Sequence, residues 1–111
     1  GAFNPATSSF VGIFAQQALS DLRITKAFLC ATGVTVESGM SNTTFLEAEI
    51  KRGVVSHASS VILVADNSKL GHDATVTFCR LQDISTFVTD QKPAPKFVEF
   101  CRAHNIRLVW E

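Results

Sequence analysis

The chain has 111 residues, which is room for a single domain. Hydrophobic residues make up 46% of it and charged residues 18%, which is enough apolar surface for a buried core and argues against disorder. Ten basic residues balance ten acidic ones, so the chain lacks the basic surface with which proteins bind nucleic-acid phosphates or anionic lipids.

The first half of the chain predicts a helix, a strand and a second helix. Apolar residues recur at i, i+3, i+4 and i+7 over Phe10–Leu22, which is typical of one helical face. The short apolar run Lys26–Ala31 then predicts a strand buried on both faces. A polar loop continues through Asn42. Thr44 and Glu47 have the spacing of a capping box, and they predict the start of a helix that runs to about His57.

The second half repeats this alternation. Strands are expected at Ser60–Ala65, Ile84–Val88 and Ile106–Trp110, with a helix over Lys96–His104 that ends at Asn105 in a left-handed cap. Turn-forming residues fill Asp66–Gly71, and Thr75–Leu81 fits either a short strand or a helical turn. Buried strands that alternate with amphipathic helices indicate an α/β fold with a Rossmann-like parallel sheet and flanking helices.

The carboxyl ends of the predicted strands are the expected place for a ligand, because loops and helix N-termini meet there in an open parallel sheet. These ends are Thr32–Gly33, Asp66–Lys69 and Thr89–Asp90. They combine the Lys69 cation with hydroxyl and amide groups, which suits an anionic, hydroxylated small molecule such as a sugar phosphate. Turn chemistry alone also accounts for Asp66, Asn67 and Ser68, with Lys69 in solvent.

The second predicted helix carries charged residues near its start. Glu47 and Lys51 are four residues apart, as in a favourable pair on a helix surface, so a solvated face and a binding site are both open interpretations. Glu49 lies two residues from Lys51 and therefore faces another direction.

Several other classes of site have little support. Cys30, Cys79 and Cys101 have no CxxC spacing and lie in apolar segments, so they are expected to be buried reduced thiols. Cys101 and His104 have no second pair of ligands, and no catalytic triad or glycine-rich phosphate loop is recognisable, so neither a metal nor a cofactor is expected. No segment has the length of a membrane span or the pattern of a secretory signal, which predicts a cytoplasmic protein without a membrane partner.

A set of ordered motifs resembles the C-terminal sensor domain of DeoR-family bacterial transcription regulators. The similarity is collinear over essentially the whole chain. The motifs are Ser9–Gly12, Asp21–Leu29, Thr32–Val34, Gly39–Met40, Glu47–Arg52, Val61–Lys69 and Ile84–Asp90.

The resemblance implies a fold related to ribose-5-phosphate isomerase and glucosamine-6-phosphate deaminase. It also implies a phosphorylated sugar as effector, a homo-oligomer, and operator DNA bound through an N-terminal helix-turn-helix. Neither that helix-turn-helix nor the first part of the sensor domain, with its phosphate loop, is in this chain. Residues 1–111 are therefore expected to be the C-terminal part of a phosphosugar-sensing domain, and to bind sugar phosphate poorly when isolated.

The resemblance carries effector-binding residues onto this sequence, with Lys69 as the foremost. The full set is Lys26, Thr32, Gly33, Glu47, Glu49, Lys51, Asp66, Ser68 and Lys69. The isomerases have an acidic element where this chain has Cys30–Val34, and family members commonly have Thr-Pro where it has Asn42–Thr43.

Sensing is therefore preferred over catalysis, since sugar-phosphate isomerisation needs a general base and the acidic element is missing. The alternative functions are a sugar-phosphate isomerase or deaminase, with Glu47 or Glu49 as base, and a pure oligomerisation module.

Overall fold

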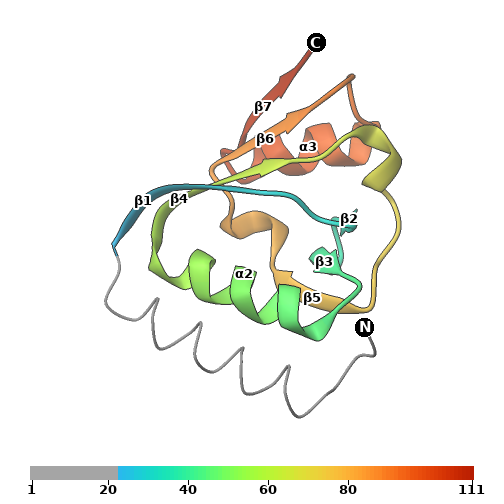
Figure 1. Cartoon of the computed structure of the whole chain (residues 1–111). Coiled ribbons are helices and arrows are strands. Elements are labelled where there is room, and N and C mark those ends of the chain that lie inside the picture. Colours follow the sequence, from blue (N-terminus) through green and yellow to red (C-terminus); the bar gives the residue numbers. More distant parts are fainter. Residues whose placement is uncertain (1–22) are drawn as a thin grey trace.

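The computed structural model describes residues 23–111, in which two sheets and two helices surround one core (Figure 1). The larger sheet is parallel and has the order β1-β4-β6-β7, formed by β1 (Ile24–Leu29), β4 (Ala58–Val64), β6 (Thr86–Thr89) and β7 (Arg107–Trp110). The smaller sheet is antiparallel and has the order β2-β3-β5, formed by β2 (Gly33–Thr35), β3 (Gly39–Asn42) and β5 (Val76–Cys79). The helices are α2 (Phe45–His57) and α3 (Pro95–Ala103), and the short 3-10 turns are η1 (Asn67–Lys69) and η2 (Leu81–Asp83).

The parallel sheet and its helices confirm the predicted α/β class. Thr44 caps α2 by accepting a hydrogen bond from the Glu47 backbone N–H (3.3 Å), as the capping-box spacing predicts. The end of α3 is also confirmed, because Asn105 has φ 56° and the Ile106 N–H donates to the Cys101 carbonyl (2.8 Å). The helix predicted over Phe10–Leu22 and the Ser9–Gly12 motif lie outside the described residues.

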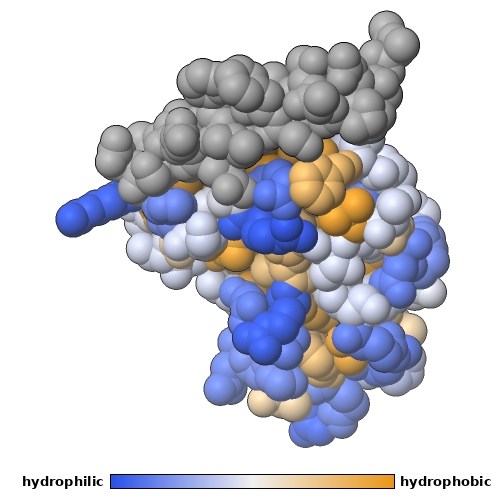
Figure 2. Space-filling view, turned by 90° about the horizontal axis from the view of Figure 1, so that it is seen from below, coloured by the Kyte–Doolittle hydropathy of each residue, from blue (hydrophilic) through white to orange (hydrophobic). Residues whose placement is uncertain are grey.

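The core lies between one face of the parallel sheet, the helices and the small sheet. Its fully buried side chains include Leu63 and Phe87 from the large sheet, Val34 and Met40 from the small one, and Leu81 of η2. Elsewhere, apolar side chains reach the surface in patches separated by hydrophilic ones (Figure 2). The large exposed ones are Phe28, Phe45, Val64 and Trp110.

The prediction that the first strand is buried on both faces is wrong. Within residues 23–111, β1 lies at the edge of the parallel sheet and pairs with β4 alone. Ala27 and Leu29 face the core, whereas Phe28 is 69% exposed on the other face. An unbroken apolar run therefore does not show by itself that both faces of a strand are buried.

The loop predicted before Asn42 is wrong as well, because β2 and β3 occupy most of it. The ambiguous segment Thr75–Leu81 supplies β5, which pairs with β3. Gly39 lets β3 approach β5 closely: its φ is +96°, and a Cβ there would lie 2.2 Å from the Cys79 carbonyl oxygen. Strands of three or four residues with polar members such as Ser41 and Asn42 give little apolar alternation from which to predict them.

Candidate functional site

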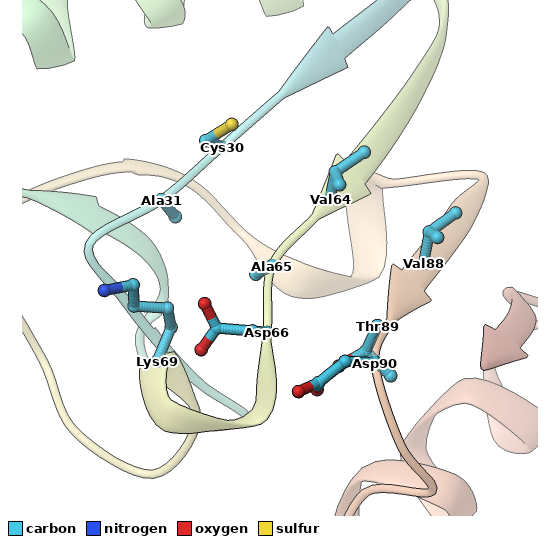
Figure 3. A pocket seen from close by; sticks show the side chains of 9 residues that line it. All are labelled: Cys30, Ala31, Val64, Ala65, Asp66, Lys69, Val88, Thr89 and Asp90. Atoms are coloured by element: carbon cyan, nitrogen blue, oxygen red, sulfur yellow. The ribbon is translucent and has the colours of Figure 1, made fainter. Parts of the chain in front are cut away.

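A pocket of about 480 Å³ lies where β1, β4 and β6 end (Figure 3). Its position at the carboxyl ends of three parallel strands is the one expected for a ligand site. The lining residues are Cys30, Ala31, Val64, Ala65, Asp66, Lys69, Val88, Thr89 and Asp90. Two of the three predicted strand ends therefore border one space. The third, Thr32–Gly33, does not line it, and the preceding residues Cys30 and Ala31 do.

The segment Asp66–Lys69, the rim turn, forms one wall of this pocket. Asp66 accepts hydrogen bonds from the Ser68 N–H (2.9 Å) and the Ser68 hydroxyl, as a turn-capping residue does. These bonds, chiefly that of the hydroxyl, lower the pKa of Asp66, and the nearby Lys69 charge lowers it further. The Lys69 side chain lies beside Asp66 (Figure 3), is half-buried, and makes no side-chain hydrogen bond or ion pair within residues 23–111. The hydrogen bonds of the turn thus account for Asp66 and Ser68, but they do not involve the Lys69 side chain.

Asn67 fixes the rim turn to the end of β6. Its backbone N–H donates to Asp90 Oδ1 (2.8 Å), and its side-chain amide donates to Thr89 Oγ1 (3.0 Å) and to the Gln91 carbonyl (2.8 Å). The Asn67 backbone N–H is the largest cause of a lowered pKa at Asp90. The two strand ends are held in register, and both aspartates are ionised near neutral pH.

The pocket therefore combines two carboxylates, one ammonium and an apolar wall. Cys30, Val64 and Val88 point to the same side (Figure 3), in agreement with the pairing of β4 with β6. Carboxylates accept hydrogen bonds from hydroxyl groups, and an ammonium donates to anionic oxygens. A small molecule that has hydroxyl groups and at least one anionic group matches this set.

A second polar cluster lies behind the Cys30–Ala31 wall and does not line the pocket. The Lys51 ammonium donates to the Cys30 carbonyl oxygen (2.6 Å) and to Asn42 Oδ1 (2.9 Å). Asn42 Nδ2 donates to Glu47 Oε2 (2.8 Å) and to Thr32 Oγ1 (3.3 Å). We call Lys51, Asn42, Glu47, Thr32 and the Cys30 carbonyl the Lys51 bracket.

The chemistry of its members fixes the Lys51 bracket in one arrangement. An ammonium can only donate and a carboxylate can only accept, so the Asn42 amide must direct its oxygen to Lys51 and its nitrogen to Glu47. Asn42 is 4% exposed. Burial lowers the pKa of Lys51, whose ammonium also lies 5.3 Å from the centre of the Phe78 ring. Glu47 and Lys51 thus meet through Asn42, which differs from the surface pair considered from the sequence.

The other predicted binding residues lie apart from the pocket. Lys26 is exposed on β1, four residues before Cys30. Glu49 pairs with Arg52, which also donates to the Thr77 carbonyl (2.7 Å), so Glu49 and Lys51 do face different directions. Gly33 lies in β2, where a Cβ would come within 2.5 Å of the His72 carbonyl oxygen.

Sequence reasoning did not include Cys30 or Asp90 among the binding residues. Cys30 was expected to be buried, but it is exposed, because it follows the last residue of an edge strand. Cys79 and Cys101 are buried as predicted, and burial raises the pKa of the Cys79 thiol to about 11. The signal for Asp90 was its place directly after a predicted strand.

Residues 23–111 contain no cluster of three or more His, Cys, Asp or Glu side chains arranged to hold a metal ion. In the same part of the chain, neither helix has the length and apolarity needed to cross a membrane.

Comparison with known proteins gives a consistent set of relatives. Residues 1–91 match the family model described as the DeoR C terminal sensor domain. The chain is 36% identical over 100 residues to the HTH-type transcriptional regulator IolR of Bacillus subtilis, covering 90% of this chain and 40% of that protein. It is 33% identical over 97 residues to the lactose phosphotransferase system repressor of Staphylococcus epidermidis, covering 86% and 38%. It is 36% identical over 90 residues to the HTH-type transcriptional regulator GlpR of Haloferax volcanii, covering 81% and 35%.

The chain thus spans two fifths or less of the length of these relatives. All three are named as regulators or repressors of transcription and none as an enzyme, in agreement with the expectation of a domain that senses and does not catalyse.

Proposed function

Since the chain belongs to the DeoR C-terminal sensor domain family, we propose that it is the effector-sensing part of a transcriptional regulator, and that its effector is a phosphorylated sugar. In this proposal residues 1–111 form the C-terminal part of the sensor domain. Operator DNA is bound by another domain of a longer cytoplasmic, homo-oligomeric protein. The effector changes operator affinity because it binds one arrangement of that protein more tightly than another.

The observation that carries the proposal is the pocket at the ends of β1, β4 and β6. The Lys69 ammonium and the Asp66 and Asp90 carboxylates line it together with an apolar wall. Lys69 supports recognition of an anionic group, and the aspartates support recognition of sugar hydroxyls. The name of the S. epidermidis relative refers to lactose, which favours a carbohydrate effector.

The position of the glutamates argues against the isomerase or deaminase alternative. Glu47 is bonded to Asn42 and Glu49 to Arg52, and neither lines the pocket. A general base must come within hydrogen-bond reach of the proton that it removes, and these carboxylates lie outside the space where a sugar would be held.

Calorimetric titration of the full-length protein with phosphorylated hexoses, pentoses and trioses tests the proposal. We expect one class to bind, and Lys69→Met to weaken that binding by about tenfold or more, since a hydrogen bond to a charged group contributes roughly 1.5–3 kcal/mol. Arg102→Met is the matched control, because Arg102 pairs with Glu99 on α3 and does not line the pocket. A folded protein that binds none of these compounds would refute the proposal.

A further inference from the structure

The Lys51 bracket joins the pocket wall to three other elements of the fold. Lys51 projects from α2 to the Cys30 carbonyl directly after β1, to Asn42 at the end of β3, and toward Phe78 of β5. Thr32 adds a second connection, because its N–H donates to the Ser41 carbonyl (2.9 Å) while its hydroxyl accepts from Asn42. The segment Cys30–Thr32 is therefore held from behind by one ammonium and one amide.

The two sides of this segment differ in what they face. Cys30 and Ala31 line the pocket, whereas Lys51, Asn42 and Glu47 do not. The Lys51 hydrogen bonds end on a backbone carbonyl and a buried amide, so its ammonium is already engaged by the protein.

We propose that Lys51 is a positioning residue of the effector pocket, acting through the Cys30 carbonyl and Asn42 and not by contact with the effector. This inference rests on the proposed function for the identity of the ligand. It assigns Lys51 a role different from the one that the family resemblance implies, and it gives Asn42 a role where family members commonly have another residue.

The same geometry gives a route by which an effector could act on the rest of the domain. A ligand that shifts the Cys30–Ala31 wall must also shift the carbonyl that Lys51 holds. It would then shift α2 or the small sheet, because the two Lys51 hydrogen bonds are short (2.6 and 2.9 Å) and Asn42 is buried. Wall, helix and small sheet behave as one unit in this account.

Effector affinity is the first test, measured with the full-length protein and the panel of sugar phosphates. Lys51→Met is expected to weaken binding by about tenfold, and Lys51→Arg, which keeps the charge and the donors, to restore most of it. Arg52→Met is the matched control: it removes a cation that links the same helix to a backbone carbonyl, that of Thr77, and it should leave affinity unchanged. Equal losses in Lys51→Met and Arg52→Met would reduce Lys51 to a general stabilising role and overturn the proposal.

A double-mutant cycle tests whether Lys51 acts through Asn42. If Lys51 acts through the bracket, Asn42→Ala and Lys51→Met share one effect, and the double variant binds about as tightly as either single variant. Additive losses would mean that Lys51 acts independently of Asn42, and that result would contradict the proposal.

Hydrogen exchange in the ligand-free full-length protein gives a test that does not depend on the identity of the effector. The Thr32 N–H should exchange faster in Lys51→Met than in the unmodified chain, and Arg52→Met should not change it. If no sugar phosphate binds the unmodified protein, the proposed function fails, and the exchange rates still decide whether Lys51 holds the wall. An unchanged Thr32 rate in Lys51→Met would show that it does not.

Discussion

The rim turn follows β4 and the Lys51 bracket holds the segment that follows β1, and the two differ in whether their polar side chains remain free to bind a ligand. In the rim turn the side chains are exposed or half-buried, and the Lys69 ammonium makes no hydrogen bond with residues 23–111. In the Lys51 bracket, Asn42 is buried and both ends of its amide are bonded. A polar residue near a ligand site can therefore bind the ligand or hold the backbone that lines the site. The hydrogen-bond partners of its side chain distinguish these two roles.

The largest loss of stability is expected in the small sheet that carries the bracket. Gly39→Ala places a Cβ 2.2 Å from the Cys79 carbonyl oxygen at φ +96°, and we expect it to lower the free energy of unfolding by about 3–4 kcal/mol. Gly71→Ala is the matched change beside the rim turn: its φ is +91° and its Cβ meets nothing within 4 Å, so about 1–2 kcal/mol is expected. Urea denaturation of both variants gives the comparison. Equal losses in the two variants would mean that the small sheet accommodates the added Cβ as easily as the segment beside the rim turn does.

The next effect compares two asparagines. Asn42→Ala leaves Lys51 without one acceptor and Glu47 without its Asn42 donor in a half-buried site, and we expect a loss of about 2 kcal/mol. Asn67→Ala removes bonds that water can replace at the exposed rim, so about 1 kcal/mol or less is expected. Thermal unfolding monitored by circular dichroism measures both. A larger loss for Asn67→Ala would show that the hydrogen bonds of the rim turn contribute more to stability than those of the Lys51 bracket, and it would contradict the comparison.

A smaller effect is expected from acid, and it should arise at the rim. The pKa values of Asp66 and Asp90 are lowered in the folded chain. Their stabilising contribution is therefore complete above the unfolded pKa of about 4, and it is lost as pH falls through the folded values. The variant D66N/D90N should unfold with a flatter dependence on pH below about 4 than the unmodified chain. Melting temperatures across this range test the prediction, and parallel curves would contradict it.

The smallest effect on stability is expected for Lys69→Met. Because its ammonium makes no hydrogen bond with the described part of the chain, the free energy of unfolding should change by no more than about 0.5 kcal/mol while effector affinity falls. Denaturation and calorimetry on the same sample provide both values. A stability loss as large as that of Asn42→Ala would place Lys69 with the structural residues.

The sequence allowed the parallel sheet and the strand-end site to be predicted, because long apolar runs and the turn residues after Ala65 are local signals. It did not predict β2 and β3, which have only three and four residues and of which β3 pairs with the distant strand β5. The family resemblance also grouped Lys51 with Lys69 as effector-binding residues. Only the packing of α2 shows that one bonds to a carbonyl and the other borders the pocket. Cys30 was predicted to be buried because it lies in an apolar run, and such a run does not reveal that the strand lies at the edge of the sheet with one face uncovered.

Protection of Cys30 from alkylation is the most direct test of the claim that the strand-end pocket binds the effector. Cys30 is exposed and lines the pocket, whereas Cys79 and Cys101 are buried and serve as internal controls. The full-length protein would be treated with iodoacetamide, and the modification of Cys30 followed by mass spectrometry, with and without the tightest-binding sugar phosphate of the panel. We predict that the rate at Cys30 falls as that compound saturates, with its midpoint at the calorimetric Kd. Saturated binding with an unchanged rate at Cys30 would place the effector elsewhere and contradict the account.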